Sequence, residues 1–187
     1  MKKHLIAIAL IGFFIATAQG VCLGANLLQN GDFESINPDM TPAGWVLSPA
    51  RNTEVNVTFD AGDKMAGSRS LKINVQNPPG RINLLPEKGA IGAPEPGKTY
   101  ELALWIKAEN LEGSALMVVP SIRLNFRPTR LQPMPMVDLL RDFKTNAGWQ
   151  EISMKATAPD GAREFLLDIM LTQGTVWLDD ITLKKID

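Results

Sequence analysis

Short runs in which apolar and polar residues alternate recur along most of this chain, and they limit what it can fold into. In the clearest run, Leu71, Ile73 and Val75 alternate with polar residues, and the sequence Asn77-Pro78-Pro79-Gly80 ends it. Successive side chains of a β-strand point to opposite faces, so a period of two predicts strands with one buried face. We predict such strands over residues 55–59, 70–75, 81–85, 99–108, 115–119, 122–126, 150–156, 165–171 and 175–183.

Helical periodicity is nearly absent. The exception is Met136 to Phe143, where a turn or two of helix is expected inside a proline-interrupted segment, residues 120–148. A sheet with one apolar face has to bury that face, and a chain made of strands does so best by packing two sheets together. The predicted fold is therefore all-β, a two-sheet antiparallel β-sandwich that forms a single domain.

Residues 1–24 have the three parts of a secretory signal peptide. Met1-Lys2-Lys3 is positively charged, Leu5 to Ala16 is almost entirely apolar, and small residues follow as far as Gly24. The apolar run is shorter than the roughly 20 residues that a membrane-spanning helix needs. We predict a signal peptide over residues 1–24 and a β-sandwich domain over residues 25–187. The protein would then be secreted, periplasmic or on the cell surface, with no membrane span.

Two alternatives to cleavage after Gly24 stay open. The segment Ala18-Gln19-Gly20 is a second possible cleavage site. A lipoprotein acylated on Cys22 is the other alternative, although Val21 is larger than the residue expected before an acylated cysteine.

Composition excludes several kinds of active site from the predicted domain. The single histidine and the single cysteine of the sequence, His4 and Cys22, both lie in the predicted leader. A Ser-His-Asp triad, a Cys-His pair and a histidine-ligated zinc are therefore excluded under cleavage after Gly24. With 19 basic and 20 acidic residues, the chain also lacks the positive charge that general nucleic-acid binding requires. Enzymes that use only carboxylates, Lys, Tyr or Arg remain possible.

Several blocks of the predicted domain resemble carbohydrate-binding modules of the galactose-binding-like jelly-roll type, the xylan- and cellulose-binding kind found with bacterial glycosidases. The resemblance rests on Asn26 to Glu34 with Gly44-Trp45, Gly67-Ser68 before Ser70 to Ile73, Pro96 to Leu102 running into Trp105 to Ala108, Trp149 to Ile152, Thr157 to Pro159, and Gly174 to Leu183. These blocks follow the order of the family and span residues 26–183. The resemblance implies a jelly roll.

The same resemblance implies a calcium site. In the family, the glutamate that ends the first block and an aspartate of the final pair meet where the first and last strands run side by side. Those positions are Glu34 and Asp180 here, with Asp179 the less favoured of the two aspartates. Calcium prefers six to eight oxygen ligands, and exported proteins meet it in abundance. We expect a structural Ca²⁺ at Glu34 and Asp180. The alternative is that both carboxylates are solvated and bind no ion.

Polar residues share one face of three predicted strands. The candidate ligand-binding residues are Arg81, Asn83, Arg123, Asn125 and Asp168. The topology of the family would place them on the concave sheet, in a polar, locally basic cleft. Arginine forks suit carboxylates, so acidic sugars such as uronates belong with neutral ones among the expected ligands. The alternative is a solvated outer sheet face without a ligand.

The aromatic residues point to packing rather than to sugar platforms. We expect at least three of Trp45, Trp105, Trp149 and Trp177, together with Tyr100, in the core. The leading functional hypothesis is a secreted, non-catalytic domain that binds a polysaccharide or oligosaccharide. The alternatives are a structural or adhesion domain with a protein partner in the cell envelope and, less favoured, a polysaccharide-active glycosidase or lyase.

Overall fold

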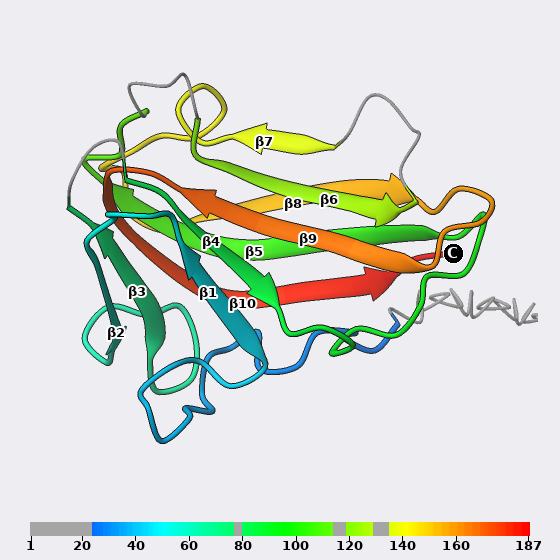
Figure 1. Ribbon diagram of the computed structural model, residues 1–187, viewed down its shortest axis with the longest axis horizontal. Helices are drawn as coiled ribbons and strands as arrows, with labels where there is room; N and C mark the ends of the chain where they lie inside the picture. The colour runs from blue at the N-terminus through cyan, green and yellow to red at the C-terminus, as the bar shows by residue number, and fades with distance from the viewer. Residues whose placement is uncertain (1–23, 77–79, 114–118, 129–134) are drawn as a thin grey trace, which may run out of the picture.

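Ten β-strands form the computed structural model (Figure 1), which describes residues 24–76, 80–113, 119–128 and 135–187. These residues contain strands and turns and no helix. The strands are β1 (Trp45–Pro49), β2 (Val55–Asp60), β3 (Ser70–Val75), β4 (Ile82–Pro86), β5 (Thr99–Glu109), β6 (Ser121–Arg127), β7 (Met136–Asp138), β8 (Gln150–Thr157), β9 (Glu164–Leu171) and β10 (Gly174–Lys185). No helix of the described residues is long and apolar enough to cross a membrane.

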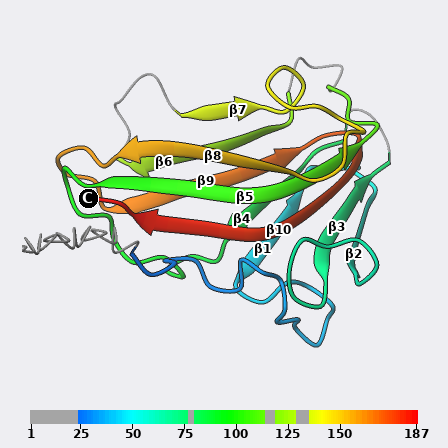
Figure 2. The ribbon, with the colours of Figure 1, turned by 180° about the vertical axis from the view of Figure 1, so that it is seen from behind.

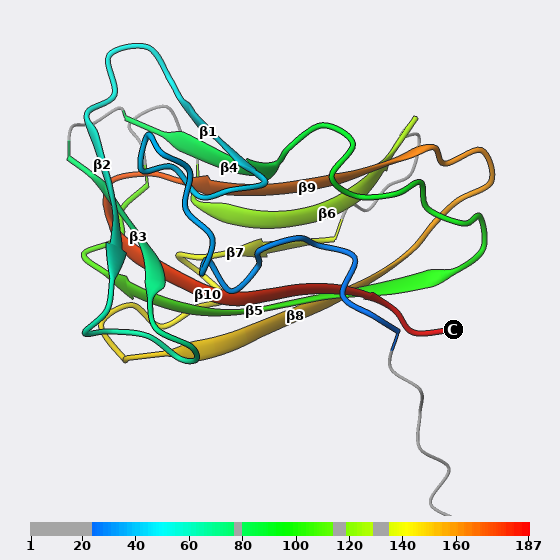
Figure 3. The same ribbon diagram turned by 90° about the horizontal axis from the view of Figure 1, so that it is seen from below.

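The strands build two five-stranded antiparallel sheets that lie face to face (Figure 3). The first sheet has the order β1-β4-β9-β6-β7 and the second the order β2-β3-β10-β5-β8. Strands β6 and β9 bow toward the second sheet, so the outer face of the first sheet is concave (Figure 3). The protein is thus a jelly-roll β-sandwich, and the predicted fold class is confirmed.

The core lies between the two sheets and follows from the period of two. Strand β5 alternates buried and half-buried residues along its whole length, with Leu102, Leu104 and Ile106 at most 1% exposed. Opposite them, Ile122 and Leu124 of β6 are fully buried. Each strand therefore contributes every second side chain to one shared apolar layer.

An aromatic cluster closes one end of this core. Tyr100 is 2% exposed and meets the Phe165 ring edge-on, with centroids 4.8 Å apart. Phe126 completes the cluster, 5.5 Å from Phe165. Tyr100 accordingly belongs to the core, as the sequence predicts.

Most predicted strands are present with bounds that differ by at most two residues, but other predictions need correction. The segment Met136 to Phe143 is not helical: residues 136–138 form β7 beside β6, and Leu139 and Phe143 turn inward from the following turns. Strand β1 was not predicted, because its short sequence ends in proline and shows no clean alternation. Of the predicted strand over 115–119, residues 115–118 lie outside the described residues, and Val119 is not in a strand.

The start of the domain runs along its last strand. The backbone N–H of Leu27 donates to the carbonyl of Leu183 at 2.8 Å, and the Asn26 side chain bonds to the backbone of Leu183 and Ile181. In the reverse view of Figure 2 this segment follows the edge of β10. The two ends of the domain are therefore neighbours, whereas all of the predicted leader except Gly24 lies outside the described residues.

Candidate functional site

Two adjoining cavities form a groove on the outer, concave face of the first sheet. The smaller cavity has a volume of about 430 Å³ and the larger about 650 Å³. The smaller one is lined by Ser48, Asn83, Leu85, Arg123, Asn125, Arg127, Leu166 and Asp168. Leu85, Arg127 and Leu166 also line the larger cavity, so the two cavities are continuous.

Strand geometry explains how these polar residues come together. Arg123, Asn125 and Arg127 lie two residues apart on β6 and therefore point to the same face. In the pairing of β6 with β9, Arg123 is directly opposite Asp168. Asn83 is supplied by β4 on the other side of β9. Three neighbouring strands thus place one polar group each in the middle of the groove.

Asp168 is the centre of a polar triad, held by one hydrogen bond and one ion pair, which we call the groove triad: Asn83, Asp168 and Arg123. Asn83 Nδ2 donates to Asp168 Oδ1 at 2.6 Å, and Arg123 Nη2 lies 3.3 Å from Asp168 Oδ2. The Arg123 and Asp168 side chains are 29% and 22% exposed. Arg123 Nε is buried without a partner in the described residues. The triad is therefore held in place while part of it faces the groove.

The structure brings four of the five predicted ligand-binding residues to the groove: Asn83, Arg123, Asn125 and Asp168. Asn125 is 6% exposed and accepts a hydrogen bond from its neighbour Phe126, so most of its side chain is buried in the floor.

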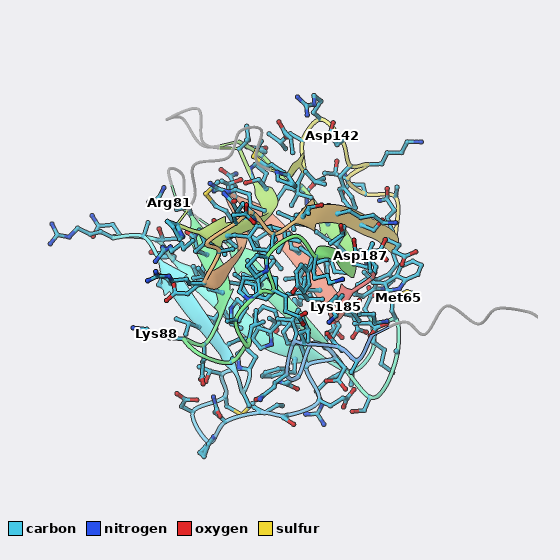
Figure 4. All side chains as sticks on the ribbon, turned by 90° about the vertical axis from the view of Figure 1, so that its right-hand side faces the viewer. Met65, Arg81, Lys88, Asp142, Lys185 and Asp187 are labelled. Atoms are coloured by element: carbon cyan, nitrogen blue, oxygen red, sulfur yellow. The ribbon has the colours of Figure 1, made fainter. Side chains whose placement is uncertain are left out.

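The prediction for Arg81 needs correction. Arg81 is exposed, lies at the periphery of the molecule (Figure 4) and does not line the groove. Strand β4 begins one residue later, and the Arg81 backbone bonds instead to Ala50 and to the Thr53 hydroxyl.

Four further residues of the groove lie outside the predicted ligand-binding set: Ser48, Leu85, Arg127 and Leu166. Arg127 was detectable, since it continues the period of Arg123 and Asn125. Ser48 lies on the unpredicted strand β1. Leu85 and Leu166 are half-buried and give the groove an aliphatic floor.

Tryptophan and tyrosine are absent from the described lining of the groove. The four tryptophans lie elsewhere in the domain. Only Trp45 of the four joins the core between the sheets. Trp177 is 4% exposed on the outer face of the second sheet, where the Lys72 and Lys107 ammonium groups lie 4.6 and 4.4 Å from its ring centroid. Trp105 and Trp149 are half-buried. The prediction of at least three core tryptophans is therefore wrong.

Asp60 at the end of β2 and Asp63 in the loop before β3 hold Trp177 and Trp149 in place on this outer face. Trp177 Nε1 donates to Asp60 Oδ2 at 2.9 Å, and Trp149 Nε1 donates to Asp63 Oδ1 at 2.7 Å. The hydrogen bond from Trp177 is the main reason why the pKa of Asp60 is below its ordinary value. Asp63 also accepts from Lys107, which raises the pKa of that lysine. Trp149 and Trp177 therefore anchor a loop, and neither lines the groove.

Of the two carboxylates predicted to bind calcium, Glu34 has other partners. Both Glu34 oxygens accept hydrogen bonds: Oε1 from the backbone N–H groups of Ser68 at 2.6 Å and Arg69 at 3.2 Å, and Oε2 from the Ser68 hydroxyl. These bonds, the hydroxyl first, hold the pKa of Glu34 below its ordinary value. Asp179, rather than Asp180, binds the same loop through the N–H groups of Met65 and Ala66.

Asp180 lies in a different place, a small cavity of about 190 Å³ on the second sheet beside Trp105, Glu101 and Glu151. No group of three or more His, Cys, Asp or Glu residues within the described ranges is spaced to hold a metal ion. Because N–H and O–H donors occupy both Glu34 oxygens, this arrangement does not offer Ca²⁺ its usual shell of oxygen ligands. Calcium stays a prediction.

Comparisons with known proteins agree on the fold and leave the family open. No protein-family model matches the sequence, and no curated protein matches it. The enzymatically active domain of tailspike protein 4 from bacteriophage CBA120 is similar at a TM-score of 0.62 and 16% identity; the match covers 86% of this chain but only 21% of that one.

Two further solved structures match over most of their own length. The CBM22-1 xylan-binding domain from Paenibacillus barcinonensis Xyn10C has a TM-score of 0.53 and 16% identity, covering 88% of this chain and 96% of that one. A Stig cyclase from Fischerella sp. TAU has a TM-score of 0.58 and 14% identity, with 87% and 98% covered. Other similar structures are also carbohydrate-binding modules. At these identities the comparisons establish the jelly-roll sandwich, which hosts both binding modules and enzymes.

Proposed function

We propose that this protein is an exported, non-catalytic domain that binds carbohydrate in the groove. The groove triad is the observation that carries the proposal. It presents an amide, a carboxylate and a guanidinium side by side, which together can accept and donate the hydrogen bonds of sugar hydroxyls. Similar structures include a xylan-binding domain and a module in complex with β-1,4-galactotriose, which supports a sugar as the class of ligand.

The aliphatic floor of the groove suits the apolar face of a sugar ring. Leu85 and Leu166 are half-buried beside the triad, and a pyranose ring has an apolar face of C–H groups that can cover them. Apolar burial contributes about 25 cal/mol per Å², so the contact supplies affinity while the triad supplies orientation. Aliphatic side chains lack the stacking geometry of an aromatic platform, and we therefore expect weaker binding than such a platform would give.

Calorimetry with a panel of neutral and acidic polysaccharides tests the proposal. Asn83→Ala and Arg123→Ala are each expected to weaken binding about tenfold or more, because each leaves part of the triad unpaired in the bound state. Arg81→Ala is the matched control, since Arg81 is an exposed arginine outside the groove. All three variants should melt within a few degrees of wild type.

Other outcomes of the same experiment point to other functions. If no glycan binds and the domain instead retains a protein of the cell envelope, the adhesion alternative replaces this proposal. Release of product from any polysaccharide would make the protein an enzyme, a role that some proteins of this fold have. Detection of the chain outside the cytoplasm, cleaved near Gly24, would support export.

The calcium prediction has its own test. For Ca²⁺ to bind Glu34, the loop of Ser68 and Arg69 has to turn its donors away and present carbonyl oxygens. If Ca²⁺ binds there, EDTA lowers the melting temperature by several degrees and elemental analysis finds about one calcium per chain. An unchanged melting temperature and a metal-free protein would show that hydrogen bonds alone hold this loop.

A further inference from the structure

The arginines of the groove differ in whether they form an ion pair. Arg123 is paired with Asp168 in the groove triad. Arg127 lines both cavities and Arg163 lines the larger one, and neither forms an ion pair within the described part of the chain. Both residues are exposed. One end of the groove therefore has two guanidinium groups that no carboxylate of the described residues neutralises by direct contact.

Backbone pairing places these two arginines next to each other. The backbone N–H of Arg163 donates to the carbonyl of Arg127 at 2.7 Å, where the end of β6 meets the start of β9. Arg127 is four residues from Arg123 along β6, which corresponds to about 13 Å for an extended strand. A ligand that reaches from the groove triad to the arginines must therefore be longer than a single sugar residue.

The larger cavity also contains opposite charges. Its lining includes Lys88 as a third cation and two carboxylates, Glu87 and Glu164. Glu164 is opposite Arg127 in the strand register, yet no ion pair joins the two. The lining of the larger cavity as a whole thus has an excess of one positive charge, in a protein of net charge −1.

We propose that the ligand of the groove is an acidic polysaccharide, with a uronate carboxylate held by Arg127 and Arg163 and neighbouring hydroxyls held by the groove triad. This inference rests on the proposed function. A guanidinium is always charged and presents a planar fork of donors that matches a carboxylate with two parallel hydrogen bonds. A neutral glycan has no anionic group that could pair with these two guanidinium groups.

The experiment compares each polymer with its own uncharged form. Polygalacturonate and alginate are titrated at low salt beside their methyl esters, with xylan and galactan as neutral glycans. Wild type is expected to bind at least one of the two acidic polymers about tenfold or more tightly than its ester, with the preference shrinking in high salt. Arg127→Gln and Arg163→Gln should each reduce that preference several-fold, and the double variant should nearly abolish it.

Arg81→Gln is the control and should keep the full preference, since it removes one exposed arginine outside the groove. Equal affinity for acid and ester, or a preference that survives in the double variant, would overturn the inference. If neutral glycans bind and acidic ones gain nothing, the groove still binds carbohydrate and only the acidic ligand is wrong. If none of these glycans binds, the proposed function fails as well.

Discussion

Asp179→Ala is expected to lower the free energy of unfolding by about 3 kcal/mol at neutral pH. The Asp179 side chain is fully buried, and its carboxylate accepts three hydrogen bonds, from the backbone N–H groups of Met65, Ala66 and Asp180 at 2.8 to 3.1 Å. Alanine would leave these donors without a partner, and an unpaired buried donor costs roughly 1–3 kcal/mol. Urea unfolding followed by tryptophan fluorescence measures the change.

The neighbouring aspartate provides the matched control. Asp180 is exposed and has a left-handed backbone with φ of 47°, a conformation that asparagine adopts readily. Asp180→Asn should therefore change the unfolding free energy by less than about 0.5 kcal/mol. If the two variants were equally stable, Asp179 would not be the residue that ties the 65–69 loop to β10.

The stabilising effect of Asp179 should also depend on pH in a definite direction. Burial raises the pKa of Asp179 above its ordinary value of 3.8, in spite of the three N–H donors. The native protein then holds this proton more tightly than the unfolded chain, so stability from this group is full below about pH 3.8 and falls as the pH rises through the folded-state pKa. The difference between wild type and Asp179→Ala should accordingly be larger at low pH than at neutral pH.

The fold could be predicted wherever a strand buries one face completely. Strands β3 and β5 alternate without a break, and their predicted bounds agree with the structure to within one residue. Prediction failed where the structure of a segment depends on pairing with another strand rather than on its own periodicity. Leu139 and Phe143 have the spacing of a helix face, yet they are buried from a turn that follows the short strand β7, which exists because β6 offers it a free edge.

The polar face of the groove could also be predicted from the alternation of residues along the strands, but not where each strand begins or bulges. The polar residues of β6 and Asp168 of β9 interrupt apolar runs at strand spacing, so their shared face follows from the sequence. Arg81 fits the same pattern but lies just before β4, and periodicity does not show where a strand begins. That Asp179 rather than Asp180 binds the 65–69 loop could not be predicted, because β10 shifts its register between Asp179 and Thr182, and such a bulge changes which side chain turns inward.

Gly31 lies where the first loop of the domain touches the last strand, and Gly31→Ala is expected to lower the free energy of unfolding by about 3–4 kcal/mol. A Cβ atom at this position would be 1.9 Å from the carbonyl oxygen of Ile181 and 2.9 Å from its carbonyl carbon. Both contacts are with backbone, so no side-chain rotation can relieve them. The loop would have to move away from β10 and lose the 2.8 Å hydrogen bond from the Ile181 N–H to the Gly31 carbonyl.

That displacement would also disturb the core, because Phe33 is only two residues further on. Phe33 is fully buried with its ring 5.6 Å from that of Trp45, and a shift of the loop pulls it from this contact. A loss of this size corresponds to roughly 10 °C in melting temperature for a domain of this length. Gly92→Ala is the control, since a Cβ there meets no atom within 4 Å, and it should leave melting unchanged. Equal melting of the two variants would mean that the first loop does not need its close approach to β10.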